Sequence, residues 1–135
     1  MKLTRGHEPG ARSERRDGPF TGEVWLDPAL TGERLSVNSV TFLPAARTHW
    51  HRHEIAQVLH VTQGLGLIWS AETETGFVLS PGDIVHIPGG ERHWHGAGPQ
   101  SLLTHLAISV GETEWLEAVA DGDYERARGA LLDTP

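Results

Sequence analysis

Residues 49–64 read HWHRHEIAQVLHVTQG, and residues 82–98 read GDIVHIPGGERHWHGAG. In both stretches histidines alternate with other residues, and this two-residue period places side chains on one face of a β-strand. The alternating histidines are His49, His51 and His53 in the first stretch and His93 and His95 in the second. Because neutral imidazole is the commonest metal ligand in proteins, the two stretches predict a metal site built on strands.

An amide side chain, that of Gln57, follows His53 after three residues, which is enough for a tight turn or a bulge. If the strands on either side of this turn pair with each other, Gln57 lies opposite the histidines at the ~5 Å spacing of a cross-strand pair. A further histidine, His105, lies in a later apolar run. Three imidazoles and one oxygen donor suit a divalent first-row metal with open coordination positions.

Short apolar runs separated by Gly and Pro turns predict an all-β domain over residues 19–110, either a sandwich or a barrel. The expected strands are residues 23–26, 35–43, 49–53, 57–62, 66–70, 76–79, 83–87, 92–95 and 102–109.

The two ends of the chain have a different pattern. Residues 1–18 are polar and highly charged, so we expect a flexible or loosely docked arm. In residues 111–135 we expect short helices, one over residues 113–120 and one after a break at residues 121–123. The side chains expected on the buried face of the second helix are Tyr124, Ala127 and Leu131.

The composition excludes several classes of protein. A chain of 135 residues is long enough for one domain with a substantial core. It has no cysteine, which rules out disulfides, thiolate metal sites and cysteine nucleophiles. The net charge is -7 and the one basic run, Arg12–Arg16, is short, so we expect no nucleic-acid partner. Because no apolar stretch reaches the ~20 residues of a membrane span and no signal segment is present, we expect a cytoplasmic protein without membrane contact.

Two spacings in the histidine-rich stretches resemble the sequence motifs of the cupin family. The first is His51-x-His53, three residues, Gln57, six residues and Gly64, and the second is Gly82, five residues, Pro88-x-Gly90, two residues and His93. The resemblance covers residues 20–110 and implies a double-stranded β-helix, the jelly-roll barrel of cupins, with a metal inside. The metal ligands that it implies are His51, His53, Gln57 and His93.

Three positions depart from the family's motifs. Gln57 stands where most cupins have Glu, Ala45 where a glycine usually opens the first motif, and Ala97 where Asn often closes the second. Three neutral imidazoles and a neutral amide leave a divalent metal with a formal charge of +2. In a barrel of low dielectric, that charge would attract an anionic ligand or lower the pKa of a bound water or alcohol.

The amino-acid sequence around the motifs is similar to those of a subgroup of small bacterial cupins. This subgroup includes manganese-dependent hydroxynitrile lyases and proteins named beside carboxymuconolactone decarboxylases. The segments concerned are Arg47-Thr48, Trp50-His51, Gln57-x-Leu59, residues 93–97 and residues 104–108. The similarity implies manganese or iron, although the donors alone would also take zinc, nickel or cobalt. It implies cleavage of a cyanohydrin to a carbonyl compound and cyanide, with the metal as Lewis acid and His105 or His95 removing the hydroxyl proton.

The same resemblance implies a substrate pocket. The pocket residues that we expect are Asn38, Val40 and Phe42 on one strand face, Thr48 as a hydrogen-bonding group, and His49 behind the ligands or at the mouth. His60 lies on the opposite strand face from Gln57 and is expected in packing or at an interface, whereas parity assigns no face to His86. Exposed strand edges and an apolar outer face favour a homodimer, which is common among small cupins.

Two other functions stay open beside the lyase. A metal-dependent dioxygenase would need a redox metal with two adjacent open positions. A non-catalytic cupin would bind a small molecule without turnover and would tolerate the loss of His95 and His105. All three functions predict a small-molecule partner and differ in oxygen consumption and turnover.

Overall fold

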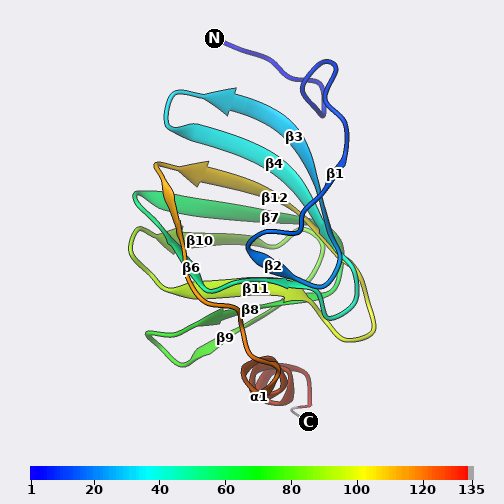
Figure 1. Cartoon of the computed structure of the whole chain (residues 1–135), viewed down its shortest axis with the longest axis vertical. Helices are drawn as coiled ribbons and strands as arrows, with labels where there is room; N and C mark the ends of the chain where they lie inside the picture. The colour runs from blue at the N-terminus through cyan, green and yellow to red at the C-terminus, as the bar shows by residue number, and fades with distance from the viewer. Residues whose placement is uncertain (134–135) are drawn as a thin grey trace.

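Two curled antiparallel sheets build the computed structural model, which describes residues 1–133 (Figure 1). One sheet has six strands and is called the larger sheet because most of its strands are longer than those of the other sheet. It contains, in spatial order, β1 (Glu14–Arg15), β3 (Val24–Gly32), β4 (Leu35–Phe42), β12 (Leu103–Val110), β7 (Ala56–Gly64) and β10 (Ile84–Pro88). The other sheet contains β13 (Thr113–Trp115), β6 (His51–His53), β11 (His93–Ala97), β5 (Arg47–Thr48) and β2 (Phe20–Thr21), with β8 (Gly66–Ser70) paired to β11 and β9 (Thr75–Leu79) paired to β8. This arrangement is the predicted jelly-roll barrel.

The core lies between the inner faces of the sheets, as the two-residue alternation predicts. On β7 the side chains of Gln57, Leu59 and Val61 are buried, while Val58 and His60 between them are half-buried on the outer face. Strand β12 alternates in the same way and buries His105 among apolar neighbours. The remaining large side chains of this core include Phe42, Ile68, Leu79, Ile87 and Leu103.

The strand pairing expected around Gln57 is wrong. Strand β7 pairs with β10 and β12, whereas β6 pairs with β11 and β13 in the other sheet. Residues 54–55 cross between the sheets, and the Ile55 N–H donates to the carbonyl of Val110 at 3.3 Å. Gln57 still faces His51 and His53, because the two sheets of a barrel present their inner faces to each other.

The helix expected over residues 113–120 is also wrong. Thr113–Trp115 forms β13, which pairs with β6. The ladder continues beyond the strand, since the N–H of Leu116 donates to the carbonyl of Trp50 at 2.8 Å and the Trp50 N–H donates to that of Glu117 at 3.0 Å. Pairing with the free edge of β6 therefore satisfies backbone groups that a short isolated helix would leave to water.

Helix α1 (Asp121–Leu132) covers the second sheet beneath β8 and β9, at the bottom of Figure 1. It begins at the residues expected to break it, with Asp121 and Asp123 in a first turn where acidic groups suit the helix dipole. The expected buried face is confirmed: Tyr124 and Ala127 are buried, Leu131 packs against the same cluster, and the Tyr124 hydroxyl donates to the carbonyl of Ala97 at 2.9 Å.

The N-terminal arm runs along the larger sheet. The Arg16 N–H donates to the carbonyl of Val24 at 2.8 Å, and β1 pairs with β3. The arm then turns inward to β2, where the carbonyl of Pro19 accepts the N–H of His49 at 2.8 Å. This path brings residues 16–20 over one end of the barrel. Among residues 1–133, no helix is long and apolar enough to cross a lipid bilayer.

Candidate metal centre

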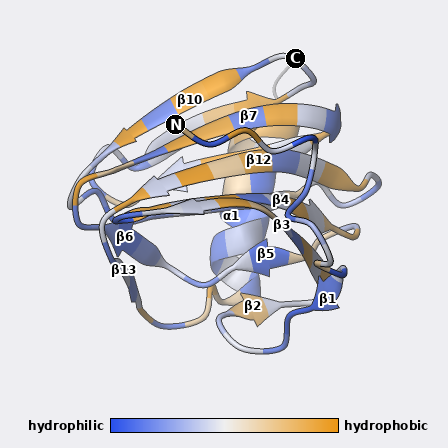
Figure 2. Cartoon of the chain, turned by 90° about the horizontal axis from the view of Figure 1, so that it is seen from above, coloured by the Kyte–Doolittle hydropathy of each residue, from blue (hydrophilic) through white to orange (hydrophobic). Residues whose placement is uncertain are grey.

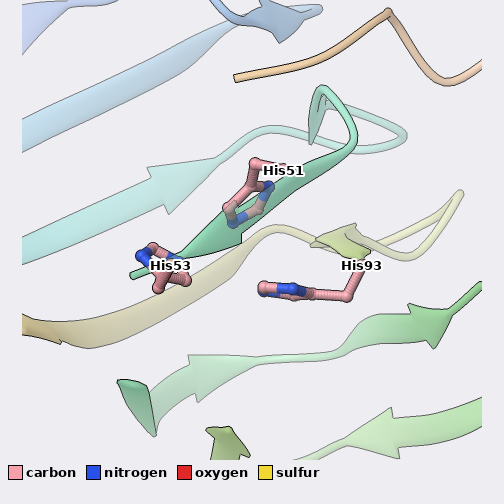
Figure 3. Close-up of side chains that lie close together, drawn as sticks. All are labelled: His51, His53 and His93. Carbon is pink, nitrogen blue, oxygen red and sulfur yellow. The ribbon is translucent and has the colours of Figure 1, made fainter. Parts of the chain in front are cut away.

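Three histidines meet inside the barrel. His51 and His53 come from β6 and His93 comes from β11, as Figure 3 shows, and the strand register pairs His93 directly with His51. All three side chains are buried, and one ligand nitrogen from each lies within 4.8 Å of the other two. Nitrogens bound to one first-row ion at ~2.1 Å are separated by no more than about 4.2 Å, so small side-chain movements suffice to bring all three onto one ion.

Backbone carbonyls orient two of these rings. His51 Nδ1 lies 2.9 Å from the carbonyl of His49, and His93 Nδ1 lies 2.9 Å from that of Glu91. Because a carbonyl only accepts, each Nδ1 carries the proton and each Nε2 keeps its lone pair. His53 Nδ1 contacts the Thr113 hydroxyl at 3.1 Å. The Nε2 atoms of His51 and His53 are buried and have no hydrogen-bond partner among the described residues, as expected of donors oriented toward a cation.

The Gln57 amide completes the donor set from the opposite sheet. Its Nε2 donates to the Ser109 hydroxyl at 3.1 Å, so its Oε1 faces His93 Nε2 at 3.3 Å. Burial lowers the pKa of His93 to about 4, and the ring is therefore neutral near pH 7. With the proton on Nδ1, the Nε2 lone pair opposes the lone pairs of the amide oxygen. A cation between these two atoms would remove the repulsion, so the residues present fit a divalent metal.

The electrostatics favour a cation whose charge is not neutralised by its ligands. Burial is the largest cause that lowers the pKa values of His51 and His53, with the neighbouring His93 also lowering that of His51. All four donors are thus neutral, and no carboxylate lines the adjoining cavity within the described chain. A divalent ion bound here would keep its full formal charge of +2 toward a substrate.

A second histidine pair lies beside the three. His105 Nε2 is 3.0 Å from His95 Nδ1, both side chains are buried, and the His95 and His51 ring centroids are 5.2 Å apart. Burial lowers the pKa of His105 to about 4 and lowers that of His95 well below its usual range. His95 lines the cavity while His105 lies behind it against Phe42. His95 Nε2, which has no partner among residues 1–133, is the atom of this pair available to a substrate.

The cavity has a volume of about 380 Å³. Asn38 and Val40, two of the residues that the sequence analysis assigned to a substrate pocket, line it. Phe42 instead packs edge-on against His95 at 5.9 Å, and the Thr48 hydroxyl accepts the His95 backbone N–H at 3.2 Å, so both support a cavity residue from behind. His49, also expected in the pocket, is absent from the described cavity wall; its carbonyl contacts His51 Nδ1 and its N–H donates to the carbonyl of Pro19.

Several lining residues were missed by the sequence analysis. They are Arg16 and Gly18 from the arm, Pro19 and Phe20 directly after it, Leu26 from β3, Ser36 from β4, Ala107 and Ser109 from β12, and Thr113 and Trp115 from β13. The two-residue alternation along β4 and β12 could have identified Ser36, Ala107 and Ser109, because they share strand faces with Asn38 and His105. No local signal identifies the arm or β13 residues, since tertiary pairing alone brings them to the cavity.

Comparisons with known proteins show which family the chain resembles. The cupin domain model matches residues 38–105. An (R)-mandelonitrile lyase of Granulicella tundricola is 44% identical over 114 residues, covering 79% of this chain and 86% of the relative. A crystal structure of a cupin-like protein from Thermotoga maritima has 36% identity and a TM-score of 0.82, covering 94% of this chain and 99% of that chain. The polyketide cyclase RemF from Streptomyces resistomycificus has the same fold, with 19% identity, a TM-score of 0.71 and 92% of each chain covered. The chain belongs to the cupin family.

Proposed function

We propose that this cupin is a metal-dependent lyase that cleaves a small cyanohydrin-like substrate to a carbonyl compound and an anion such as cyanide. The observation that carries the proposal is the set of four neutral donors beside a cavity-facing imidazole, His95. The 44% identity to an (R)-mandelonitrile lyase supports the same chemistry.

The residues divide into holding and proton-transfer groups. His51, His53, His93 and Gln57 hold the cation, which supplies Lewis acidity toward a substrate oxygen. His95 takes the hydroxyl proton at Nε2, because its pKa is lowered by burial and the ring is neutral before the substrate binds. His105 is a positioning residue, since its Nε2 contacts His95 Nδ1 at 3.0 Å and holds that ring toward the cavity.

We propose manganese or iron as the cation. Three imidazoles with one amide oxygen form a mixed nitrogen and oxygen donor set, and the resemblance to manganese-dependent hydroxynitrile lyases favours these two metals. The same donors accept zinc, nickel and cobalt, so metal content decides among them.

The test is metal content and turnover of protein purified without a His tag. Stoichiometric metal in the wild type should be lost in His51→Ala and kept in His60→Ala, a matched control that removes an outer-face histidine. With mandelonitrile as substrate, His95→Gln should keep the metal and lose benzaldehyde release. Metal-free wild-type protein would refute the proposal.

The same experiment separates the alternatives. Oxygen consumption by the metal-loaded protein without benzaldehyde release would indicate a dioxygenase. Ligand binding without turnover, unchanged in His95→Gln, would indicate a non-catalytic binding cupin.

We also propose a homodimer that covers the outer face of the larger sheet. The register aligns Val37, Ile108 and Val58 across three strands, and aligns Leu106, His60 and Ile84 in the next row. Figure 2 shows hydrophobic segments on β7, β10 and β12 beside hydrophilic ones, and Ile84 is 70% exposed. Half-buried apolar side chains aligned across neighbouring strands in this way favour an interface. Light scattering should give a dimer for the wild type and a monomer for Ile84→Asp, and a monomeric wild type would refute the dimer.

A further inference from the structure

We propose that the cavity selects substrates carrying an anionic group, of which a carboxylate is the simplest, and that Arg16 binds this group at the cavity mouth. The reacting oxygen of the same substrate would face the three histidines. Only the placement of that reacting end rests on the proposed lyase function.

The charge of the cavity wall is the first support. The chain has 18 acidic residues and a net charge of -7, yet none of the sixteen described residues that line the cavity is acidic. Arg16 is the one cationic Lys or Arg side chain among them. An acidic protein that keeps carboxylates away from one cavity and places a guanidinium there has a cavity suited to anions.

The position of Arg16 is the second support. Its backbone is anchored to the larger sheet by the 2.8 Å hydrogen bond to Val24. Its side chain is about half exposed, and its ion pair with Glu14 is loose at 3.7 Å. A guanidinium has five N–H donors in a planar fork, so donors remain for a bidentate carboxylate.

Arg15, the preceding residue, is a natural control. Its ion pairs are with Asp17 and Glu23, both at 3.8 Å, and it is absent from the described cavity wall. Arg15 carries the same charge as Arg16, lies in the same arm and is similarly exposed. A difference in ligand binding between Arg16→Gln and Arg15→Gln is therefore due to the position of Arg16 at the cavity and not to the charge of the arm.

The wall between the two ends defines the body of the substrate. The ring centroid of Trp115 lies 4.7 Å from that of His51 and 5.7 Å from that of Phe20. These aromatic contacts link the candidate metal ligands to the end of the arm. The other apolar wall residues are Leu26, Val40 and Ala107. An apolar or aryl body with a polar head at the histidines and an anionic tail at Arg16 matches this order of surfaces.

The test compares benzoate with benzamide, which have nearly the same shape and differ in charge. Binding of each is measured by calorimetry or NMR titration to wild type, Arg16→Gln and Arg15→Gln, in both metal-loaded and chelator-treated protein. The chelator-treated series removes direct attraction between the carboxylate and the cation. It also keeps the result independent of whether the lyase proposal holds.

We expect Arg16→Gln to weaken benzoate binding about threefold to fivefold, as for a partly exposed ion pair, in both series. Benzamide binding should stay unchanged in every variant, and Arg15→Gln should bind benzoate as the wild type does. Equal benzoate affinity in the two variants would overturn the proposal. Equal loss of benzoate and benzamide, or no binding of benzoate to the wild type, would also overturn it.

Discussion

The fully buried His105 should make the metal-free protein lose stability in mild acid. Burial lowers its pKa to about 4 in the folded chain, while the unfolded chain has the ordinary value of ~6.5. Between these two values the unfolded state binds a proton that the folded state does not. The free energy of unfolding therefore falls as the pH drops through 6.5 and stops falling, for this group, below about 4.

The size of the effect follows from the two pKa values. At pH 5 the imidazole is almost fully protonated in the unfolded chain and mostly neutral in the folded one, and linkage gives a loss of about 2 kcal/mol relative to pH 7. His105→Gln removes the titrating group and keeps an amide that can hydrogen-bond to His95. Any constant cost of the substitution cancels when one variant is compared with itself at two pH values.

The assay is urea unfolding of chelator-treated protein at pH 7 and pH 5. Wild type should lose more stability than His105→Gln between these conditions, by about 2 kcal/mol. His7→Gln, which removes an exposed histidine from the arm, separates the effect of burial from the loss of an imidazole. An equal acid loss in wild type and His105→Gln would refute the reasoning, because it would mean that His105 binds a proton equally well in both states.

Four further results are expected. Ser109→Ala should weaken metal binding about tenfold in a chelator competition, because it frees the Gln57 amide that the hydroxyl orients. Ala45→Gly should raise the free energy of unfolding by about 0.5–1 kcal/mol, since Ala45 has a φ of 66° and glycine adopts this region without strain. Gly64→Ala should strongly lower it in the same urea assay, because the added Cβ would overlap the carbonyl oxygen of Leu102. Manganese at about 100 times its dissociation constant should stabilise the wild type by about 2.7 kcal/mol in thermal unfolding and leave His51→Ala unchanged.

Much of the fold was predictable because it depends on local pattern. The two-residue spacing of His51 and His53, and of Gln57 and Leu59, placed each side chain on the correct strand face. Turn residues separated the strands, and two motif spacings identified the family. The cupin motif usually has a glycine at position 45. Ala45 occupies the left-handed conformation that glycine favours, so the motif correctly indicated the backbone conformation there.

The errors arose where pairing between distant segments decides the structure. Residues 113–115 have a helix-compatible sequence, but the free edge of β6 draws them into a strand. Gln57 reaches the histidines across the barrel and not through a neighbouring strand, which parity along one segment cannot reveal. The path of the arm, which carries Arg16 to the cavity mouth, depends on its hydrogen bonds to β3.

The sequence by itself therefore determined the strand faces, the family and the four candidate metal donors, because side-chain alternation and motif spacing are properties of short segments. Only the tertiary structure decided the direction of the Gln57 oxygen, the burial that keeps His93 and His105 neutral, and the wall that surrounds the cavity. These features depend on which distant segments pack together, since hydrogen-bond partners, loss of hydration and cavity shape exist only once both sheets and the arm have come together.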